Sequence, residues 1–105
     1  MLKVELLIRD IERYKTLVRQ SDKSVFVLKR HLKESVEFCI QEKEKWTNLL
    51  IHLSHNDPLG STKQNKAYLS AKRHVERDEA AHKIAVDYNL VLKDHLRYLL
   101  SKQDR

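Results

Sequence analysis

Three polar residues in the second half of the chain have a spacing that could bind a metal ion. His74, Asp78 and His82 are spaced four residues apart, so a helix would place them on one face. Two imidazoles and a carboxylate can ligate a divalent transition metal. Such spacing is common by chance, however, and only Cys39 could add a further ligand. We therefore interpret Asp78 and His82 as polar positions in a helix–helix contact, where such residues fix register, and we predict no metal and no cofactor.

The only cysteine, Cys39, would resemble a nucleophile if His82 lay beside it as a base. The rest of such a site is missing from the sequence. Gly60 is the only glycine, and no P-loop, dinucleotide fingerprint, paired-cysteine motif or HExxH motif is present. A cysteine at a helix contact more often serves as a small buried apolar residue. We predict that the protein is not an enzyme and has no small-molecule substrate.

A heptad repeat dominates the first half of the chain. Eight uncharged residues recur at intervals of seven: Val4, Ile11, Val18, Val25, Leu32, Cys39, Trp46 and Leu53. A second row lies three residues further on in each heptad: Leu7, Tyr14, Ser21, Leu28, Ser35, Glu42 and Leu49. This pattern is typical of one long helix whose apolar stripe must be covered by another helix. Since the repeat passes residues 20–24 without a change of phase, we predict a continuous helix over about residues 2–54.

Turn-forming residues follow this helix. Asn56, Asp57, Pro58 and Gly60 predict a turn over about residues 55–62, because proline cannot continue a helix. A second helix is predicted over about residues 63–103. It carries two rows of its own: Tyr68, Val75, His82, Asn89 and Leu96, and Ala71, Asp78, Ala85, Leu92 and Leu99.

The predicted fold class is all-α. We expect a single helical domain over residues 1–105, folded as a long antiparallel, coiled-coil-like hairpin that dimerises into a four-helix bundle. The alternative is a three-helix bundle in which the first helix breaks at residues 20–24, where serines could cap a new helix.

A turn centred near residue 60 predicts the register of the hairpin. Trp46 would face Val75, Lys43 would face Asp78, and Cys39 would face His82. The second helix would then reach back only to about residue 18, which leaves an N-terminal apolar row without cover from its own chain. Exposed apolar rows mark interaction sites, so we predict a homodimer, or contact with another protein, through this row. Its residues are Val4, Leu7, Ile8, Ile11, Tyr14 and Val18.

The net charge of +6 is mild, and the two halves of the chain share the excess equally. One basic stripe stands out at the start of the second helix, where the helix dipole disfavours positive charge. It hints weakly at an acidic partner such as nucleic acid, acidic protein tails or anionic lipid. The residues of this basic stripe are Lys63, Lys66, Lys72, Arg73 and Arg77.

Compartment and function follow from these observations. A single cysteine fits a reducing compartment, no segment approaches the ~20 apolar residues of a membrane span, and the N-terminal residues do not resemble a signal peptide. We therefore expect a cytoplasmic or nuclear protein. The predicted function is a coiled-coil protein–protein interaction or oligomerisation module of a scaffold or adaptor protein. The alternative is a basic helical module that binds an acidic surface.

Overall fold

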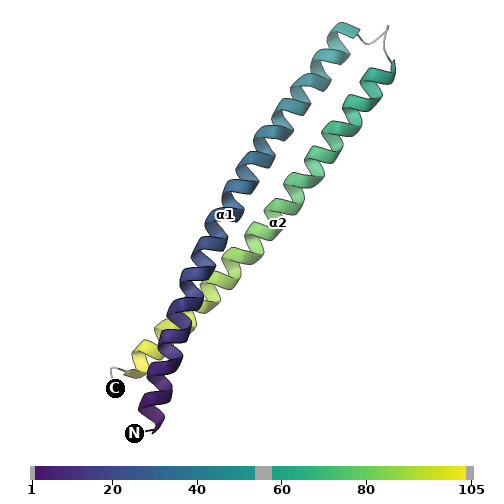
Figure 1. The fold of residues 1–105 in the computed structure, drawn as a ribbon. Helices are drawn as coiled ribbons and strands as arrows, with labels where there is room; N and C mark the ends of the chain where they lie inside the picture. The colour runs from purple at the N-terminus through teal and green to yellow at the C-terminus, as the bar shows by residue number, and fades with distance from the viewer. Residues whose placement is uncertain (1, 54–57, 104–105) are drawn as a thin grey trace. The chain divides into compact units, whose positions relative to one another are not determined.

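The computed structural model describes residues 2–53 and 58–103, and the side chains of residues 3–50 and 63–103 within them. Every described residue is helical. Helix α1 comprises Leu2–Leu53 and helix α2 comprises Pro58–Gln103. The two helices run antiparallel as a helical hairpin (Figure 1). The predicted all-α hairpin is thereby confirmed, while its assembly into a four-helix bundle stays a prediction.

Helix α1 passes through residues 20–24 without a break, so the predicted continuous helix is confirmed and the three-helix alternative is wrong. The serines of this stretch explain why it does not break. The Ser24 hydroxyl donates to the main-chain carbonyl of Gln20 at 3.2 Å, and Ser21 is buried in the contact with α2. Their hydroxyls are thus used within the helical structure rather than as caps of a new helix.

The connection between the helices is shorter than predicted. Helix α2 begins at Pro58, because proline has no N–H to lose and its fixed φ suits the first turn of a helix. Gly60 lies inside α2, and no glycine has a positive φ. The predicted turn over 55–62 is therefore wrong at its C-terminal end, while residues 54–57, including Asn56 and Asp57, lie outside the described residues.

The chain divides into two compact units. Unit 1 combines Met1–Leu28 with His82–Arg105, and unit 2 is Lys29–Ala81. Each unit pairs one part of α1 with one part of α2 in antiparallel orientation. We describe the two units separately.

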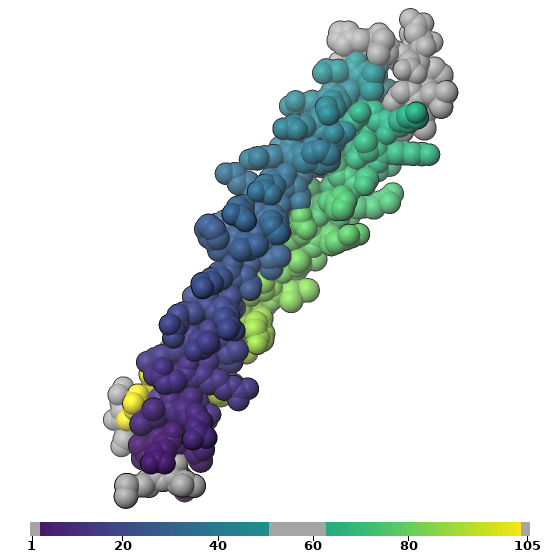
Figure 2. All heavy atoms as spheres, viewed as in Figure 1, coloured from purple at the N-terminus to yellow at the C-terminus, as the bar shows by residue number. Residues whose placement is uncertain are grey.

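Within both units the predicted heptad rows form the contact between the helices. We call this contact the seam. Of the described apolar side chains, only Ile11, Ala71, Leu92 and Leu99 are buried. The other described apolar side chains of these rows are half-buried, except Val4, which is exposed. On the face drawn in Figure 2, coloured side chains of both helices project outward. The seam is therefore one side chain thick, as expected when two helices have only each other to pack against.

The predicted register is wrong in both units. In unit 2, Trp46 stacks on Tyr68 with ring centroids 5.9 Å apart, which is one heptad before Val75. Asp78 accepts a hydrogen bond from the Ser35 hydroxyl instead of facing Lys43. The cause is the short connection: because α2 begins at Pro58, the midpoint of the turn moves toward the N-terminus. In an antiparallel hairpin the numbers of two facing residues add up to twice the midpoint of the turn. Moving the midpoint therefore shifts the facing residue by twice as many positions.

The corrected register gives the N-terminal row a cover that we did not expect. In unit 1, Ile11 is only 3% exposed, and the Tyr14 ring lies 4.4 Å from the ring of His95 on α2. The expectation that these residues lack cover from their own chain is therefore wrong. Leu7 and Val18 are half-buried, whereas Val4 and Ile8 are exposed.

Replacing Ile11 with alanine should lower the free energy of unfolding by about 2 kcal/mol or more, because the change leaves a cavity in a thin seam. The matched control is Ile40→Ala, at a position that is 52% exposed, where a loss below about 1 kcal/mol is expected. Urea denaturation followed by circular dichroism measures both. Equal losses in the two variants would contradict the burial of Ile11.

Candidate interaction surfaces

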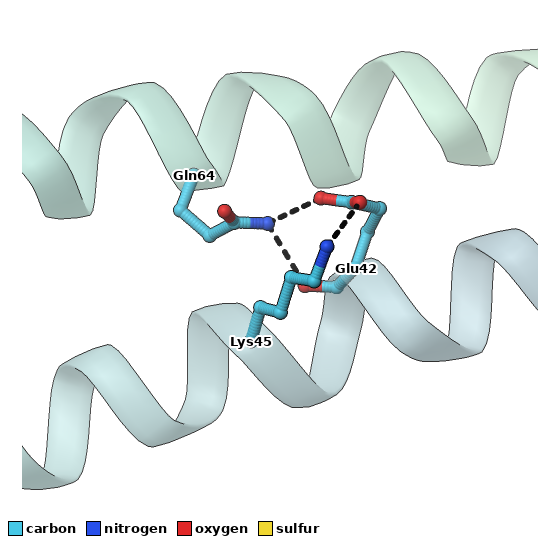
Figure 3. Close-up of polar contacts among 3 residues, drawn as sticks. All are labelled: Glu42, Lys45 and Gln64. Atoms are coloured by element: carbon cyan, nitrogen blue, oxygen red, sulfur yellow. Dashed lines mark hydrogen bonds and ion pairs between the residues drawn. The ribbon is translucent and has the colours of Figure 1, made fainter.

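A buried carboxylate interrupts the apolar seam of unit 2. Glu42 is buried, and the Gln64 side-chain amide donates to its carboxylate at 2.5 Å and to its main-chain carbonyl at 3.3 Å. The Lys45 ammonium lies 3.3 Å from the other carboxylate oxygen (Figure 3). The hydrogen bond from Gln64, helped by Lys45, holds the pKa of Glu42 below its usual value of 4.5, although burial opposes this effect.

A second polar contact joins the helices of unit 1. The buried Asn89 amide donates to the Ser21 hydroxyl at 2.9 Å and to the Asp22 carboxylate at 3.0 Å. The Lys93 ammonium lies 3.2 Å from the same carboxylate oxygen. The hydrogen bond from Asn89, followed by the one from Lys93, lowers the pKa of Asp22 from its usual 3.8. Such paired polar residues set the alignment of two helices, because a slip would leave each partner unsatisfied.

The residues considered for metal binding or catalysis have other surroundings. Asp78 is half-buried and hydrogen-bonded to Ser35, while His74 is exposed. Over residues 2–53 and 58–103, no three histidine, cysteine or acidic side chains gather as a metal site would require. Cys39 is a free, half-buried thiol, and no histidine is among the described residues that line the depression beside it.

The most exposed apolar surface of unit 1 lies on α2. Ile84, Tyr88, Val91 and Tyr98 are between 54% and 70% exposed, and their spacing of four, three and seven follows a heptad pattern offset from the seam. We call these four residues the α2 stripe. His95 fills the gap in the stripe and its ring lies 6.0 Å from that of Tyr98. The offset of these positions from the two seam rows of α2 is the signal in the sequence that could have identified them.

Helix α1 presents a hollow in the same unit. Lys23, Ser24, Val27 and Leu28 line this shallow, open hollow. The Asn89–Ser21 hydrogen bond shows which residues of α1 and α2 lie at the same height along the helix axes of unit 1. Ile84 lies five residues before Asn89, and the centre of the hollow lies between four and five residues after Ser21. The hollow and Ile84 are thus level with each other.

Unit 2 has a different depression, which both helices line. Its apolar residues are Val36, Cys39, Ile40, Tyr68 and Val75, and two lysines, Lys43 and Lys72, complete its lining. Its volume is about 250 Å³, below the roughly 300–1,000 Å³ of pockets that bind small molecules. We call this depression the lysine groove.

The predicted basic stripe lies on the surface of unit 2. All five of its residues are exposed, and none of them is within 4.0 Å of a carboxylate in the described part of the chain. Tyr68, which lies between Lys66 and Lys72 in the sequence, stacks on Trp46 in the seam. The stripe therefore offers positive charge without a ring on which a base could stack.

Comparison with known proteins gives no relative: no family model, no curated protein and no solved structure matches this chain. Within the described residues, neither helix contains an apolar stretch that could cross a membrane.

The lowered pKa of Glu42 predicts how stability changes in acid. Its carboxylate stabilises the fold above its usual pKa of 4.5, and this contribution is lost as the pH falls through 4.5 toward the lower pKa of the folded chain. We expect the melting temperature to fall less between about pH 6 and about pH 3 in Glu42→Gln than in the wild type. Glu44→Gln removes an exposed acid two residues away and should behave as the wild type. Thermal unfolding at several pH values tests this, and identical pH curves for both variants would contradict it.

Proposed function

We propose that this protein is a coiled-coil protein–protein interaction module of a scaffold or adaptor protein and that it assembles as a homodimer. The exposure of the α2 stripe is the observation that carries this proposal. Its four side chains are each more than half exposed, and a contiguous exposed apolar patch on a monomer is often functional. The free thiol of Cys39 supports a reducing compartment, cytoplasm or nucleus.

Self-association would bury the α2 stripe through an antiparallel contact between α1 and α2, the same kind of contact that the two helices make within one chain. If a two-fold axis runs parallel to the helices of unit 1, α1 of a second copy lies across α2 of the first, antiparallel and at the same level. Ile84 would then lie against the shallow hollow formed by Lys23, Ser24, Val27 and Leu28 of the second copy. A four-helix arrangement of this kind covers the side of each helix that the seam leaves open.

Charge supports the same arrangement. Asp87 lies two residues before Asn89, and Lys23 lies two residues after its partner Ser21, so the two charges are level. Asp94 and Arg13 each lie one residue before the contacting residues His95 and Tyr14, so in this antiparallel pair they are offset by two residues, about 3 Å along the helices.

The ion pair that Asp94 already makes does not prevent it from pairing with a residue of the second copy. Asp94 lies 3.4 Å from Arg97 on its own helix, and both side chains are largely exposed. Exposed pairs contribute little stability, so Asp94 can accept a new partner. The N-terminal row stays a predicted contact surface, in which Val4 and Ile8 are the exposed members.

The alternative function, a basic module that binds an acidic surface, is supported by the exposure of Lys63, Lys66, Lys72, Arg73 and Arg77. Nucleic acid, acidic protein tails or anionic lipid would be its partners. Binding through these residues alone would weaken steeply with salt. Titration of the chain against an oligonucleotide at two salt concentrations distinguishes this function from self-association.

Replacing Val91 with aspartate should convert the dimer into a monomer. Sedimentation equilibrium should then give the 12.5 kDa of one chain instead of about twice that mass. Leu90→Asp is the matched control, because Leu90 is also more than half exposed but lies outside the α2 stripe. A wild-type monomer, or a dimer that survives Val91→Asp, would contradict the proposed interface. If Ile8→Asp alone dissociates the dimer, the N-terminal row is the interface.

A charge exchange tests the geometry of the dimer. Asp87→Lys and Lys23→Asp should each self-associate at least about tenfold more weakly than the wild type, since two like-charge contacts form across the interface. A mixture of the two variants restores opposite charges at both contacts and should form heterodimers. Sedimentation of each variant and of the mixture measures this. No gain on mixing would contradict the axis parallel to the helices.

A further inference from the structure

We propose that the lysine groove of unit 2 binds an amphipathic helical segment of another protein that carries carboxylates beside its apolar residues. This site is independent of the proposed dimer, because the groove is lined only by residues of unit 2 and the dimer interface uses only residues of unit 1.

The shape of the groove selects a side chain rather than a small molecule. Its floor consists of seam residues, among them Cys39, Tyr68 and Val75, which are half-buried. Val36 and Ile40 are exposed at its wall. A volume of about 250 Å³ is less than the roughly 300–1,000 Å³ of typical ligand pockets. One or two apolar side chains of a docked segment would fill it.

The wall of the groove continues along α1 with helical spacing. Val36, Ile40, Lys43 and Leu50 follow one another at intervals of four, three and seven, so they share one face of the helix. Residues 36–50 span about 21 Å at 1.5 Å per residue. Leu50 is 40% exposed. A helix laid against this face can use the same spacing, which is the helix-in-groove mode of recognition.

The charges of the groove select a carboxylate. Lys43 comes from α1 and Lys72 from α2, and both line the groove. In the described part of the chain neither ammonium has a carboxylate within 4.0 Å. Two ammonium groups beside an apolar floor favour a partner with apolar residues flanked by glutamate or aspartate, and they disfavour one flanked by lysine.

The test uses the full chain and a pair of synthetic peptides. Both peptides are helical, with leucines at heptad spacing, and they differ only in the flanking residues, which are glutamate in one and lysine in the other. Fluorescence anisotropy should show at least about tenfold tighter binding of the glutamate peptide, a difference of 1.4 kcal/mol. The variant Lys43→Glu/Lys72→Glu should reverse this preference, and Ile40→Ser should weaken binding of the glutamate peptide.

A control variant separates the groove from the basic stripe. Lys66→Glu/Arg73→Glu makes the same change of charge on unit 2, but neither residue lines the groove, so this variant should keep the preference for the glutamate peptide. Circular dichroism checks that every variant stays helical. Equal loss in both double variants, or binding that Ile40→Ser leaves unchanged, would overturn the proposal. So would a wild-type chain that binds neither peptide, or that binds only vesicles of anionic lipid.

Discussion

The alignment of the two helices depends on a few paired polar side chains in the seam. A seam with only four buried apolar residues in the described part of the chain can slide by a heptad at little cost, because each apolar layer resembles the next. A slip would separate Asn89 from Ser21, and Gln64 from Glu42. Each separation would leave a buried polar group without a partner, which costs about 1–3 kcal/mol. Position along the seam is therefore specified by polarity, while affinity between the helices comes from the apolar residues.

Because polar pairs set the alignment and apolar residues supply the affinity, the surfaces that remain for partners are mainly apolar. The polar pairs use up the hydrogen-bonding groups of the seam, and within the described residues no buried side-chain polar atom lacks a partner. Apolar side chains, in contrast, exceed what one contact between two helices can bury. The excess is found at defined offsets from the seam, in the α2 stripe of unit 1 and along the wall of the lysine groove in unit 2. Surfaces for partners therefore remain because each helix has only one neighbouring helix to cover its apolar side chains, whereas a helix in a three- or four-helix bundle has at least two.

The sequence alone was sufficient for the helices and for the rows that form the seam, because a repeat of seven residues is a local property of the chain. It was insufficient for the register, because that depends on where α2 begins. Pro58 was interpreted as the middle of a turn, although the same residue is equally suited to the first turn of a helix. Because of that one choice, Val75 was predicted to face Trp46, whereas Tyr68 does so in the structure. For the same reason Ile11 was predicted to lack cover from α2, although it is buried. The pairing of Glu42 with Gln64 could not be foreseen, since the assumed turn separated them differently.

The corrected register also changes what kind of dimer is reasonable. With α2 reaching the N-terminal part of α1, Ile11 and Tyr14 contribute to the stability of unit 1 and offer little to a partner. The surface left for a second copy lies to one side of the seam. There the hollow beside Ser24 and the side chain of Ile84 are level within a single chain. A projection and a hollow at the same level suit a two-fold axis parallel to the helices, because such an axis preserves level and brings each projection to the other chain's hollow.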